Sequence, residues 1–411
     1  MTLGVYIQVP FCASKCSFCN FSSRVERASA FDAYVRALEI EIERAPRLSE
    51  KGIAAETLAL AVDTIYIGGG TPSLLGGERL ARIVQALRRR FDVQAQLECT
   101  LEVTPGSADR ELLKKLLELG VNRLSIGAQT FSDQELSSVG RLHSAEETGD
   151  LVRRAREAGF ANLSLDLIAG LPHQTEESWS RTLESAAELK PEHVSLYLFE
   201  VDEKSRLGRE VLHDGARYHA AAVPDEEFMA KAYESGRQFL AREGYGHYEI
   251  SNFALAGFES RHNLKYWNLE PYRGFGAGAH SFDGMHRWAN EPDPTAYMEQ
   301  TASGMTRATE WRALSLQEQI EEFFFLGLRR RQGVSLAAAE RRWGRQRIEY
   351  WRAVIARLER QGWLECEGER VRLADRALLV SNEVFQEFLA DGVQVGATGA
   401  LESPSGLRPF C

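Results

Sequence analysis

Short apolar segments alternate with longer amphipathic segments up to about residue 245, and this alternation constrains the fold more than any other feature of the chain. The apolar segments predict strands at 5–9, 64–67, 97–103, 123–127, 163–168 and 193–199. The other segments predict helices around 30–45, 78–90, 108–119, 144–158, 176–188 and 225–243. Strands joined by helical crossovers pair in parallel, which leaves either an open doubly wound sheet or a partial barrel.

Polar or glycine-rich residues stand at or just after nearly every predicted strand. They are Cys12, Gly68 to Thr71, Glu102, Gln129 and Asp166. In a βα barrel the carboxyl ends of the strands converge on one face, so residues far apart in the sequence surround one site. A doubly wound sheet would instead gather its ligand contacts at a switch point. We therefore predict an α/β fold with a six-stranded, TIM-like partial (β/α)6 barrel.

Three cysteines, Cys12, Cys16 and Cys19, form a CxxxCxxC pattern near the start of the chain. Three thiolates can hold three irons of a 4Fe-4S cluster and leave the fourth iron open to a non-protein ligand. A zinc site normally takes four nitrogen or sulfur ligands, and no second pair follows downstream. A disulfide would leave one of the three cysteines unpaired. The remaining cysteines are isolated in the sequence and are interpreted as ordinary thiols: Cys99, Cys366 and Cys411.

The composition and the beginning of the sequence predict a soluble, cytoplasmic protein. Oxidation-sensitive cluster chemistry fits a reducing compartment, and Met1 to Phe11 predicts a strand and not a signal peptide. The sequence contains no stretch of about 18 uncharged apolar residues, so it predicts no transmembrane helix. The formal net charge of -10 disfavours nucleic acid as a partner, because phosphate binding depends on an excess of Lys and Arg.

The length of 411 residues exceeds the usual size of one domain. We expect the core barrel to occupy residues 1–243. The Gly- and aromatic-rich segment 244–313 is expected to cover or complete the barrel mouth. Residues 314–390 predict a helical, winged-helix-like α+β domain. The Gly-, Ser- and Pro-rich residues 391–411 predict a disordered tail.

The predicted winged-helix-like domain combines an Arg-rich helical region with two strand candidates, near 363–366 and 370–373. The arginines between residues 329 and 347 are, taken alone, typical of a surface that binds nucleic acid. Glu340 and Glu349 are interspersed with them, which is typical of a solvated helix face with ion pairs. We therefore interpret this region as a structural surface or a surface for protein docking.

A glycine-rich loop, Gly68-Gly69-Gly70-Thr71-Pro72, follows the second predicted strand, where glycines let the backbone approach a ligand closely. Together with the cysteine loop, it resembles the radical S-adenosylmethionine (SAM) superfamily. Within that superfamily the chain resembles the oxygen-independent coproporphyrinogen III oxidase (HemN-like) family from residue 4 to about 388. The resemblance is carried by YIQVPFC at 6–12, GGGTPS at 68–73, NRLSIGAQ at 122–129, GRLH at 140–143 and DLIAGLP at 166–172.

The resemblance implies that Cys12, Cys16 and Cys19 bind the 4Fe-4S cluster, whose reduced form passes an electron to the sulfonium of SAM. It also implies contacts with one or two SAM molecules for a further set of residues: Tyr6, Phe18, Gly70, Thr71, Glu102, Gln129, Arg141 and Asp166. A carboxylate can accept hydrogen bonds from SAM, and Arg141 can pair with the SAM carboxylate. Each polar residue taken alone also fits a structural role at a strand end. No catalytic residue is assigned.

Two groups within the family differ near the cluster. The true oxidase carries a fourth cysteine two residues after the third, and a longer segment before the cluster. This chain has Phe21 at that position and only eleven residues before Cys12. It is similar instead to the HemW-type heme chaperones, because it contains the stretch His262-Asn263-x-x-Tyr266-Trp267.

The chain departs from the family pattern at three positions near the predicted site. They are Gln8 in place of His, Asn20 in place of Asp, and Thr104 in place of Asn. Loss of an imidazole beside the cluster removes a proton donor, and this disfavours a decarboxylase. It leaves open whether SAM is cleaved.

The resemblance implies a carrier that binds heme and passes it to acceptor hemoproteins, with an electron donor as a further partner. Imidazole suits heme iron, so the candidate ligands are His262 and His280, with His247 third, although a single histidine is more often a hydrogen-bonding residue. As an enzyme the chain would be a SAM-dependent oxidoreductase of porphyrin biosynthesis acting on coproporphyrinogen III, or a related radical SAM methyltransferase. Contact with membrane proteins would be peripheral.

Overall fold

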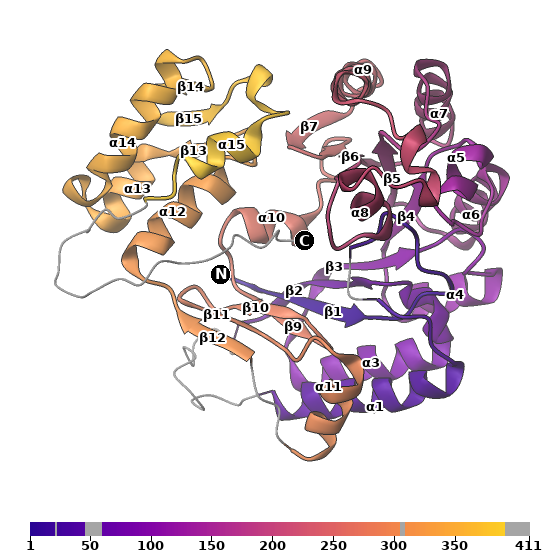
Figure 1. The fold of residues 1–411 in the computed structure, drawn as a ribbon. Helices are drawn as coiled ribbons and strands as arrows, with labels where there is room; N and C mark the ends of the chain where they lie inside the picture. The colour runs from indigo at the N-terminus through magenta and orange to yellow at the C-terminus, as the bar shows by residue number, and fades with distance from the viewer. Residues whose placement is uncertain (21–22, 46–59, 305–308, 391–411) are drawn as a thin grey trace. The chain divides into compact units, whose positions relative to one another are not determined.

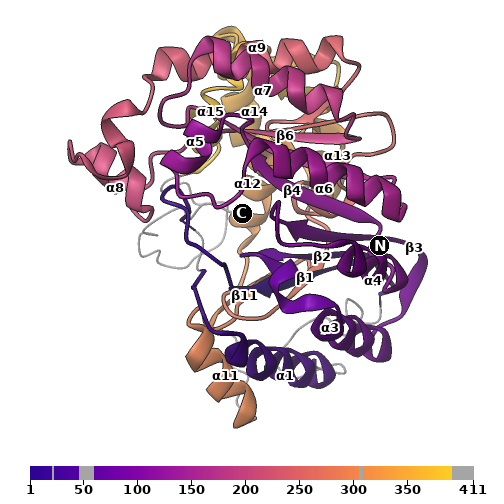
Figure 2. The ribbon, with the colours of Figure 1, turned by 90° about the vertical axis from the view of Figure 1, so that its right-hand side faces the viewer.

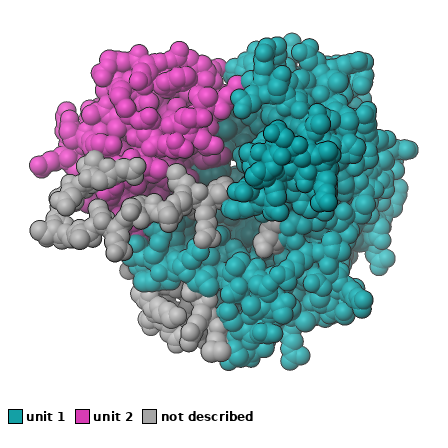
Figure 3. All heavy atoms as spheres, in the orientation of Figure 1, with its two compact units in different colours: residues 1–313 teal, residues 314–411 magenta. Residues whose placement is uncertain are grey.

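The structure is a computed structural model that describes residues 1–20, 23–45, 60–304 and 309–390. The chain divides into two compact units, Met1–Ala313 and Leu314–Cys411 (Figure 3). The regions 1–243 and 244–313, which the sequence analysis separates, belong to the same compact unit. The tail that the sequence predicts to be disordered, residues 391–411, lies outside the described residues.

Six parallel strands form the centre of the first unit, as the sequence predicts (Figure 1). They are β1 (Leu3–Val9), β2 (Val62–Gly69), β3 (Val93–Val103), β4 (Arg123–Gln129), β5 (Leu163–Ala169) and β6 (His193–Leu198). Each strand pairs in parallel with the next one along the chain. The carboxyl ends of all six strands therefore point toward the same end of the sheet.

Helices connect the strands and cover one face of the sheet (Figures 1 and 2). The predicted helices are α1 (Ala28–Arg44), α3 (Gly76–Arg90), α4 (Arg110–Glu118), α6 (Ala145–Ala158), α7 (Glu176–Glu188) and α9 (Glu226–Arg242). Ser144 begins α6 with a capping box, because its side chain accepts from the Glu147 backbone and the Glu147 carboxylate accepts from the Ser144 backbone.

Several short helical elements were not predicted. They are α5 (Asp133–Ser138), α8 (Arg206–Leu212) and the 3-10 turns η1 (Pro72–Leu75) and η2 (Arg217–Ala222). Elements of so few residues do not contain enough turns to show a helical repeat of apolar positions. Elements α5, α8 and η1 follow strand ends, and η2 follows α8. Residues of α5, α8 and η2 line one pocket.

Side chains alternate along the parallel strands between an apolar outer row and a polar inner row. The outer row packs beneath the helices and is almost fully buried: Ile7, Ile65, Leu101, Ile126 and Leu165. Burial of each such side chain contributes about 1.5–3 kcal/mol. On the inner face Tyr6 is level with Tyr66, and Glu102 is level with Ser125. The core therefore lies between sheet and helices, and the inner face is left for polar groups.

Residues 244–313 extend the sheet beyond both outer strands of the parallel core. Beside β1 lie β9 (Tyr272–Phe275), β10 (His280–Phe282), β11 (His286–Ala289) and β12 (Thr309–Ala313). Beside β6 lie β8 (Asn252–Ala254) and β7 (Gly246–Glu249). The segment also contains the helices α10 (Arg261–Trp267) and α11 (Pro294–Ala302). The described residues thus form a 12-stranded sheet, in the order β12-β11-β10-β9-β1-β2-β3-β4-β5-β6-β8-β7.

Strand β9 belongs to this segment and is not apparent from the sequence. It pairs in parallel with β1, so that Gly4 is level with Tyr272 and Ile7 with Phe275. Gly274 allows its close packing, because a Cβ added there would lie 2.2 Å from the carbonyl oxygen of His280. A short glycine-containing strand gives no clear alternation in the sequence, and none was predicted here.

The second unit has the predicted combination of helices and a hairpin. Its helices are α12 (Leu316–Gly327), α13 (Leu336–Trp343), α14 (Arg345–Arg360) and α15 (Ser381–Gln386), with a 3-10 turn η3 (Asp375–Ala377). Its sheet has the order β13-β15-β14 and contains β13 (Val334–Ser335), β14 (Leu364–Glu367) and β15 (Arg370–Leu373). Glu340, one of the two acidic residues interspersed in the Arg-rich region, pairs at 2.7 Å with Arg352, which lies just beyond that region. None of the described helices has both the length and the hydropathy needed to cross a membrane.

Candidate functional site

The cysteine loop follows β1 and is attached to the neighbouring glycine loop by backbone hydrogen bonds. The N–H of Gly70 donates to the carbonyl of Val9 at 2.8 Å, and the N–H of Thr71 donates to the carbonyl of Phe11 at 2.6 Å. Cys12 donates to the carbonyl of Arg24 at 2.9 Å, which closes the loop on itself. Two loops that are far apart in the sequence therefore form one backbone surface at the carboxyl ends of β1 and β2.

Among the three cysteines of this loop, Cys16 is buried and Cys12 and Cys19 are half-buried. Arg141 lies beside them: its Nη1 is 3.6 Å from the Cys16 sulfur, and its Nη2 donates to the Gly127 carbonyl at 2.8 Å. The Nε of Arg141 is buried and has no hydrogen-bond partner among the described residues. A buried donor of this kind fits an anionic ligand group, because leaving it unpaired costs about 1–3 kcal/mol.

The donor set of the loop suits a cluster better than a single ion. Across the described part of the chain, no three His, Cys, Asp or Glu side chains converge where one metal ion would bind. A 4Fe-4S cluster is usually held by cysteine thiolates, each on its own iron. Cys12, Cys16 and Cys19 are thiols on one short loop, so their chemistry fits that group.

The glycine loop has no room for side chains. A Cβ on Gly70 would lie 2.5 Å from the carbonyl oxygen of Phe11, and one on Gly68 would lie 2.6 Å from Glu102 Oε1. Gly69 has a φ of +107°, a backbone conformation that favours glycine. The three consecutive glycines are thus required by the close approach of β1, β2 and β3.

Gln8 lies where the family resemblance expects a histidine. Its Oε1 accepts a hydrogen bond from the Tyr6 hydroxyl at 2.6 Å, and its carbonyl accepts one from the Tyr34 hydroxyl at 2.9 Å. Its side chain faces Gly69, because a Cβ built there would lie 2.4 Å from Nε2. An amide at this position does not titrate near neutral pH, so it cannot replace imidazole as a proton donor.

Glu102 stands at the end of β3 and faces the glycine loop. Its Oε2 accepts from the Gly69 N–H at 2.9 Å, and its Oε1 accepts from the Tyr66 hydroxyl at 2.9 Å. Burial raises the pKa of Glu102 to about 7, although these two hydrogen bonds oppose the shift. The carboxyl group is therefore balanced between its charged and neutral forms near neutral pH.

Gln129 ends β4 in a strained conformation. Its φ is +67°, and the register of β4 against β5 shifts between Ile126 and Gln129. The side chain is buried, and its Nε2 would lie 2.8 Å from a Cβ added to Gly127. Left-handed conformations of non-glycine residues cost about 1–3 kcal/mol and gather at functional sites. The bulge directs Gln129 toward the same strand end that carries Arg141.

Asp166 lies on the inner face of β5, where Ser125 of the neighbouring strand β4 donates to both of its oxygens at 3.1 and 3.2 Å. Burial raises the pKa of Asp166, against the hydrogen bond from Ser195. Inner-face residues such as Tyr66 and Ser125 were not among the predicted site residues. They show in the sequence as polar residues or glycines at every second position, as in Thr64-Tyr66-Gly68 and Arg123-Ser125-Gly127.

Phe18 is placed differently from the other predicted SAM contacts. It packs against an apolar cluster formed by Val139, Ile168, Leu171, Phe199, Leu207 and Ala220. Thr71, by contrast, is buried beside the cysteine loop, and Tyr6 stacks on Tyr66 with ring centroids 6.0 Å apart. The structure therefore gathers Tyr6, the glycine loop, Glu102 and Arg141 around the cysteine loop, and gives Phe18 a packing role at the edge of that loop.

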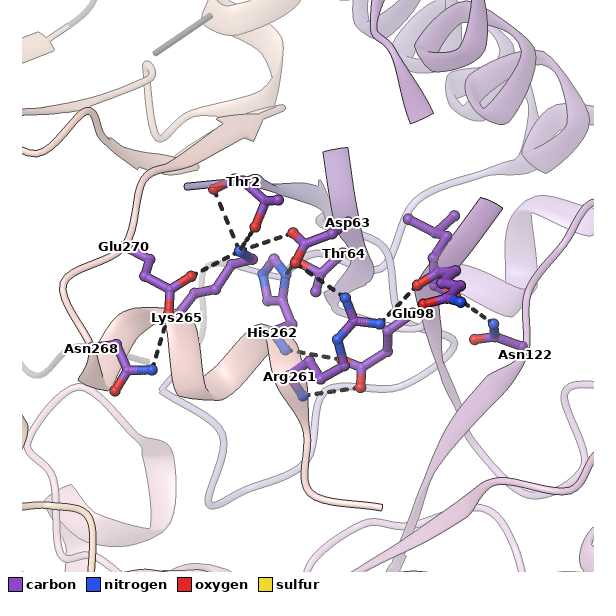
Figure 4. A network of polar contacts seen from close by, with 12 residues as sticks. Thr2, Asp63, Thr64, Glu98, Asn122, Arg261, His262, Lys265, Asn268 and Glu270 are labelled. Atoms are coloured by element: carbon purple, nitrogen blue, oxygen red, sulfur yellow. Dashed lines mark hydrogen bonds and ion pairs between the residues drawn. The ribbon is translucent and has the colours of Figure 1, made fainter. Parts of the chain in front are cut away.

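His262 lies at the opposite, amino end of the strands (Figure 4). Its Nδ1 is 2.9 Å from Thr64 Oγ1, and its Nε2 is 2.8 Å from the Tyr266 hydroxyl. The residue is 1% exposed, and burial lowers its pKa to about 3, assisted by the nearby charge of Lys265. Both ring nitrogens are occupied, so this geometry does not support the expectation that His262 binds heme iron.

The surroundings of His262 form a dense polar network (Figure 4). Lys265 is buried, and its Nζ lies 2.9 Å from Asp63, 3.1 Å from Glu270 and 2.8 Å from the Thr2 hydroxyl. The backbone N–H groups of Arg261 and His262 donate to the carboxylate of Glu98 at 3.0 and 2.9 Å. The network fastens α10 to the first residues of the chain, to the start of β2 and to the middle of β3, which is a structural role.

The two other heme candidates lie on separate strands. His280 is exposed on β10. His247, on β7, stacks on Phe253 with centroids 4.3 Å apart and has its Nε2 3.2 Å from the carbonyl oxygen of Ile250. Neither is among the residues that surround the cysteine loop in the geometry above.

Comparison with known families matches two parts of the chain. Residues 6–186 match the radical SAM superfamily, and residues 314–380 match the HemN C-terminal domain. The chain is 35% identical over 390 residues to the protein of Lactococcus lactis named heme chaperone HemW, which covers 95% of this chain and 98% of the relative. It is 37% identical over 389 residues to the protein of that name from Bacillus subtilis, with coverage of 94% and 99%.

Among solved structures, the chain is similar to coproporphyrinogen III oxidase (HemN) from Escherichia coli, which is described as a radical SAM enzyme. The TM-score is 0.82 at 25% identity, with 95% of this chain and 90% of the other covered. This likeness confirms the predicted fold class: a partial barrel of the radical SAM type followed by an α+β domain of the HemN C-terminal kind.

Proposed function

The chain belongs to the HemW family of the radical SAM superfamily, and from that membership we propose that it is a heme chaperone. It binds heme and transfers it to acceptor hemoproteins. The observation that carries the proposal is the match over nearly the full length of relatives named heme chaperones. The chaperone acts in the cytoplasm, because a reducing compartment suits a cysteine-bound cluster.

Cys12, Cys16 and Cys19 hold a 4Fe-4S cluster in this proposal. When bound, the cluster supplies an electron to the sulfonium of SAM, and an electron donor protein is a further partner. The chain's own residues orient SAM: the buried Nε of Arg141 pairs with its carboxylate. Glu102 and Asp166, on the same inner face, accept from its amine or hydroxyl groups. The other proposed contacts are Tyr6, Gly70, Thr71 and Gln129, with Phe18 supporting the loop.

The second candidate function is oxygen-independent oxidation of coproporphyrinogen III, which the structural likeness to HemN favours. The presence of Gln8 disfavours this oxidation. Decarboxylation benefits from a group that moves a proton near neutral pH, and the amide of Gln8 hydrogen-bonds to Tyr6 and moves none. We therefore place heme transfer first.

The two functions are distinguished by their products. Anaerobically reconstituted protein is titrated with heme and then mixed with apomyoglobin, and heme uptake is followed by absorbance. The same preparation is incubated with SAM, a reductant and coproporphyrinogen III, and the porphyrins are separated. We expect about one heme per chain, transferred to apomyoglobin, and no protoporphyrinogen. Protoporphyrinogen formation, or the absence of heme binding, would overturn the proposal.

A further inference from the structure

Two histidines that the sequence analysis did not single out face one another near the cysteine loop. His173 Nε2 lies 3.0 Å from His219 Nδ1, and the ring centroids are 5.0 Å apart at an interplanar angle of 70°. The residues come from the turn after β5 and from η2, 46 positions apart. No described group is hydrogen-bonded to the other nitrogen of His219, and its ring is exposed.

His219 lines a pocket of about 470 Å³ that lies directly on the cysteine loop. The volume is in the range of small-molecule and cofactor sites. Three lining residues, Ser14, Lys15 and Ser17, stand between Cys12 and Cys19 in the sequence. The others are Ser137, Ser138, Val139, Gly140, Arg206, Ala216 and Tyr218. The pocket thus contains two cations and no carboxylate, in a chain with a formal net charge of -10.

A buried polar atom of the pocket lacks a partner. Ser17 is 3% exposed, and its hydroxyl has no hydrogen-bond partner within the described ranges. The backbone of Ser17 is fixed on both sides, because its N–H donates to the Val139 carbonyl at 3.0 Å and its carbonyl accepts from Leu207 at 2.8 Å. A buried hydroxyl without a partner costs about 1–3 kcal/mol, which a polar ligand group in the pocket would recover.

The backbone holds the aromatic residues of this region in a costly conformation. The φ angles of His173, Tyr218 and His219 are +67°, +56° and +59°. His173 also donates its backbone N–H to the Ala222 carbonyl at 2.8 Å, which fastens the two turns together. Each non-glycine residue of this kind costs about 1–3 kcal/mol, and two of them, Tyr218 and His219, line the pocket.

The histidine pair can present one ring nitrogen to a metal. When His219 donates its Nδ1 hydrogen to Nε2 of His173, Nε2 of His219 carries a free lone pair in the neutral ring. A hydrogen bond to the second nitrogen is the usual support of a metal-binding histidine, because it fixes the tautomer and the ring orientation. His173 supplies that support here.

We propose that this pocket is the heme site, an inference that rests on the proposed function and names where it occurs. His219 ligates the iron through Nε2, and His173 positions it. Tyr218, whose ring already lies 5.1 Å below the guanidinium of Arg206, faces the porphyrin plane. Lys15 and Arg206 pair with the two propionates, and the Ser17 hydroxyl hydrogen-bonds to one of them.

The test is heme titration of the full, reconstituted chain and its single variants, followed by absorbance and electron paramagnetic resonance. We expect His219→Ala to weaken heme binding about 100-fold and to lose the imidazole-ligated iron signal, and added imidazole to restore that signal. His173→Ala should weaken binding about tenfold and shift the spectrum, as expected of a positioning residue. The double variant Lys15→Gln, Arg206→Gln should weaken binding but keep the spectrum.

Two controls separate this inference from the proposed function. His213→Ala changes another exposed histidine close in sequence, outside the pocket lining, and should bind heme as wild type does. His262→Gln should do the same. If wild type binds no heme, the proposed function fails and this site with it. If wild type binds heme and His219→Ala binds it with the same affinity and spectrum, the site is wrong and the chaperone function stands.

Discussion

The two ends of the parallel sheet are built on opposite principles. At the carboxyl end, Gln129 is strained and the Arg141 Nε has no partner within the described residues. At the amino end, the buried ammonium of Lys265 reaches three oxygen groups, and His262 uses both ring nitrogens. The unpaired donor and the backbone strain at Gln129 and Arg141 fit the proposed ligand site, whereas the filled hydrogen-bond network of Lys265 and His262 fits a structural role.

Burial shifts the pKa of one acidic group and one basic group at these ends, in opposite directions. It raises the pKa of Glu102 to about 7 at the carboxyl end and lowers the pKa of His262 to about 3 at the amino end. Both groups are driven toward their neutral forms. Both ring nitrogens of His262 already have partners. The motif His262-Asn263-x-x-Tyr266-Trp267 therefore does not by itself indicate a ligand site.

The largest expected effect is at the cysteine loop. Cys16→Ser removes one of three proposed cluster ligands and should reduce the iron content of reconstituted protein from about four atoms per chain to almost none. Iron and sulfide analysis measures this. Cys99→Ser is the matched control, because Cys99 is buried in the core and burial raises its pKa to about 12, which makes it a poor thiolate donor. Full iron content in Cys16→Ser would mean that the loop holds no cluster.

Next in size is the buried ion-pair network. Lys265→Met leaves Asp63 and Glu270 without their buried ammonium and should lower the free energy of unfolding by about 3–5 kcal/mol. Guanidinium unfolding followed by circular dichroism measures the loss. Lys231→Met makes the same change in an exposed pair with Glu227 and should give no measurable loss. Equal stability of the two variants would contradict a structural role for the amino end.

A smaller effect is expected where the two carboxyl-end loops meet. In Gly70→Ala the new methyl group would lie 2.5 Å from one backbone carbonyl oxygen and 2.8 Å from another, so the loops must separate. We expect a loss of about 1–3 kcal/mol in stability and weaker SAM binding by calorimetry. Gly149→Ala, in α6, has its nearest contact at 4.0 Å and should keep both properties. Unchanged SAM binding in Gly70→Ala would remove the glycine loop from the proposed site.

The smallest effect for a single step of one pH unit is the pH dependence of stability, and its sign differs between the two ends. His262 stabilises the fold fully above its unfolded pKa, near 6.5, and this contribution is lost as pH falls toward 3. The contribution of Glu102 is complete below its unfolded pKa, near 4.5, and is lost as pH rises through about 7. Between pH 4.5 and 6.5, each changes the unfolding free energy by up to about 1.4 kcal/mol per pH unit.

The variants His262→Gln and Glu102→Gln should therefore change the pH slope of stability in opposite directions. Unfolding free energies measured from pH 4.5 to 7.5 give both slopes. His262→Gln should become less sensitive to acid than wild type, and Glu102→Gln less sensitive to base. Slopes that shift in the same direction would mean that burial does not control these two groups.

The strands, the long helices and the hairpin of the second unit could be predicted because they depend on local periodicity. The six parallel strands and α6, with its capping box at Ser144, are examples. The cysteine and glycine loops were predicted for the same reason, since each is a continuous motif. The radical SAM fold class is confirmed, whereas the cluster and SAM contacts stay predictions.

What could not be predicted depends on contacts between distant residues. β9 is inserted beside β1 although nothing in its own four residues indicates a strand. His173 and His219 meet in left-handed turns, and backbone angles of that kind are uncommon for residues other than glycine, so the sequence does not indicate them. One partner of His262, Tyr266, belongs to its sequence motif, but the other, Thr64, comes from β2, so the motif alone could not reveal that both ring nitrogens have partners.

The pairing of β1 with β9 sets an order on folding during translation. Residues 4–7 leave the ribosome early, but the strand that covers their second edge, residues 272–275, is made last among the strands beside them. At about 5–20 residues per second, that edge stays open for roughly 15–50 s. An open strand edge invites pairing with other chains. The nascent chain therefore has a period of exposure to aggregation that ends when β9 emerges and Lys265 meets Thr2.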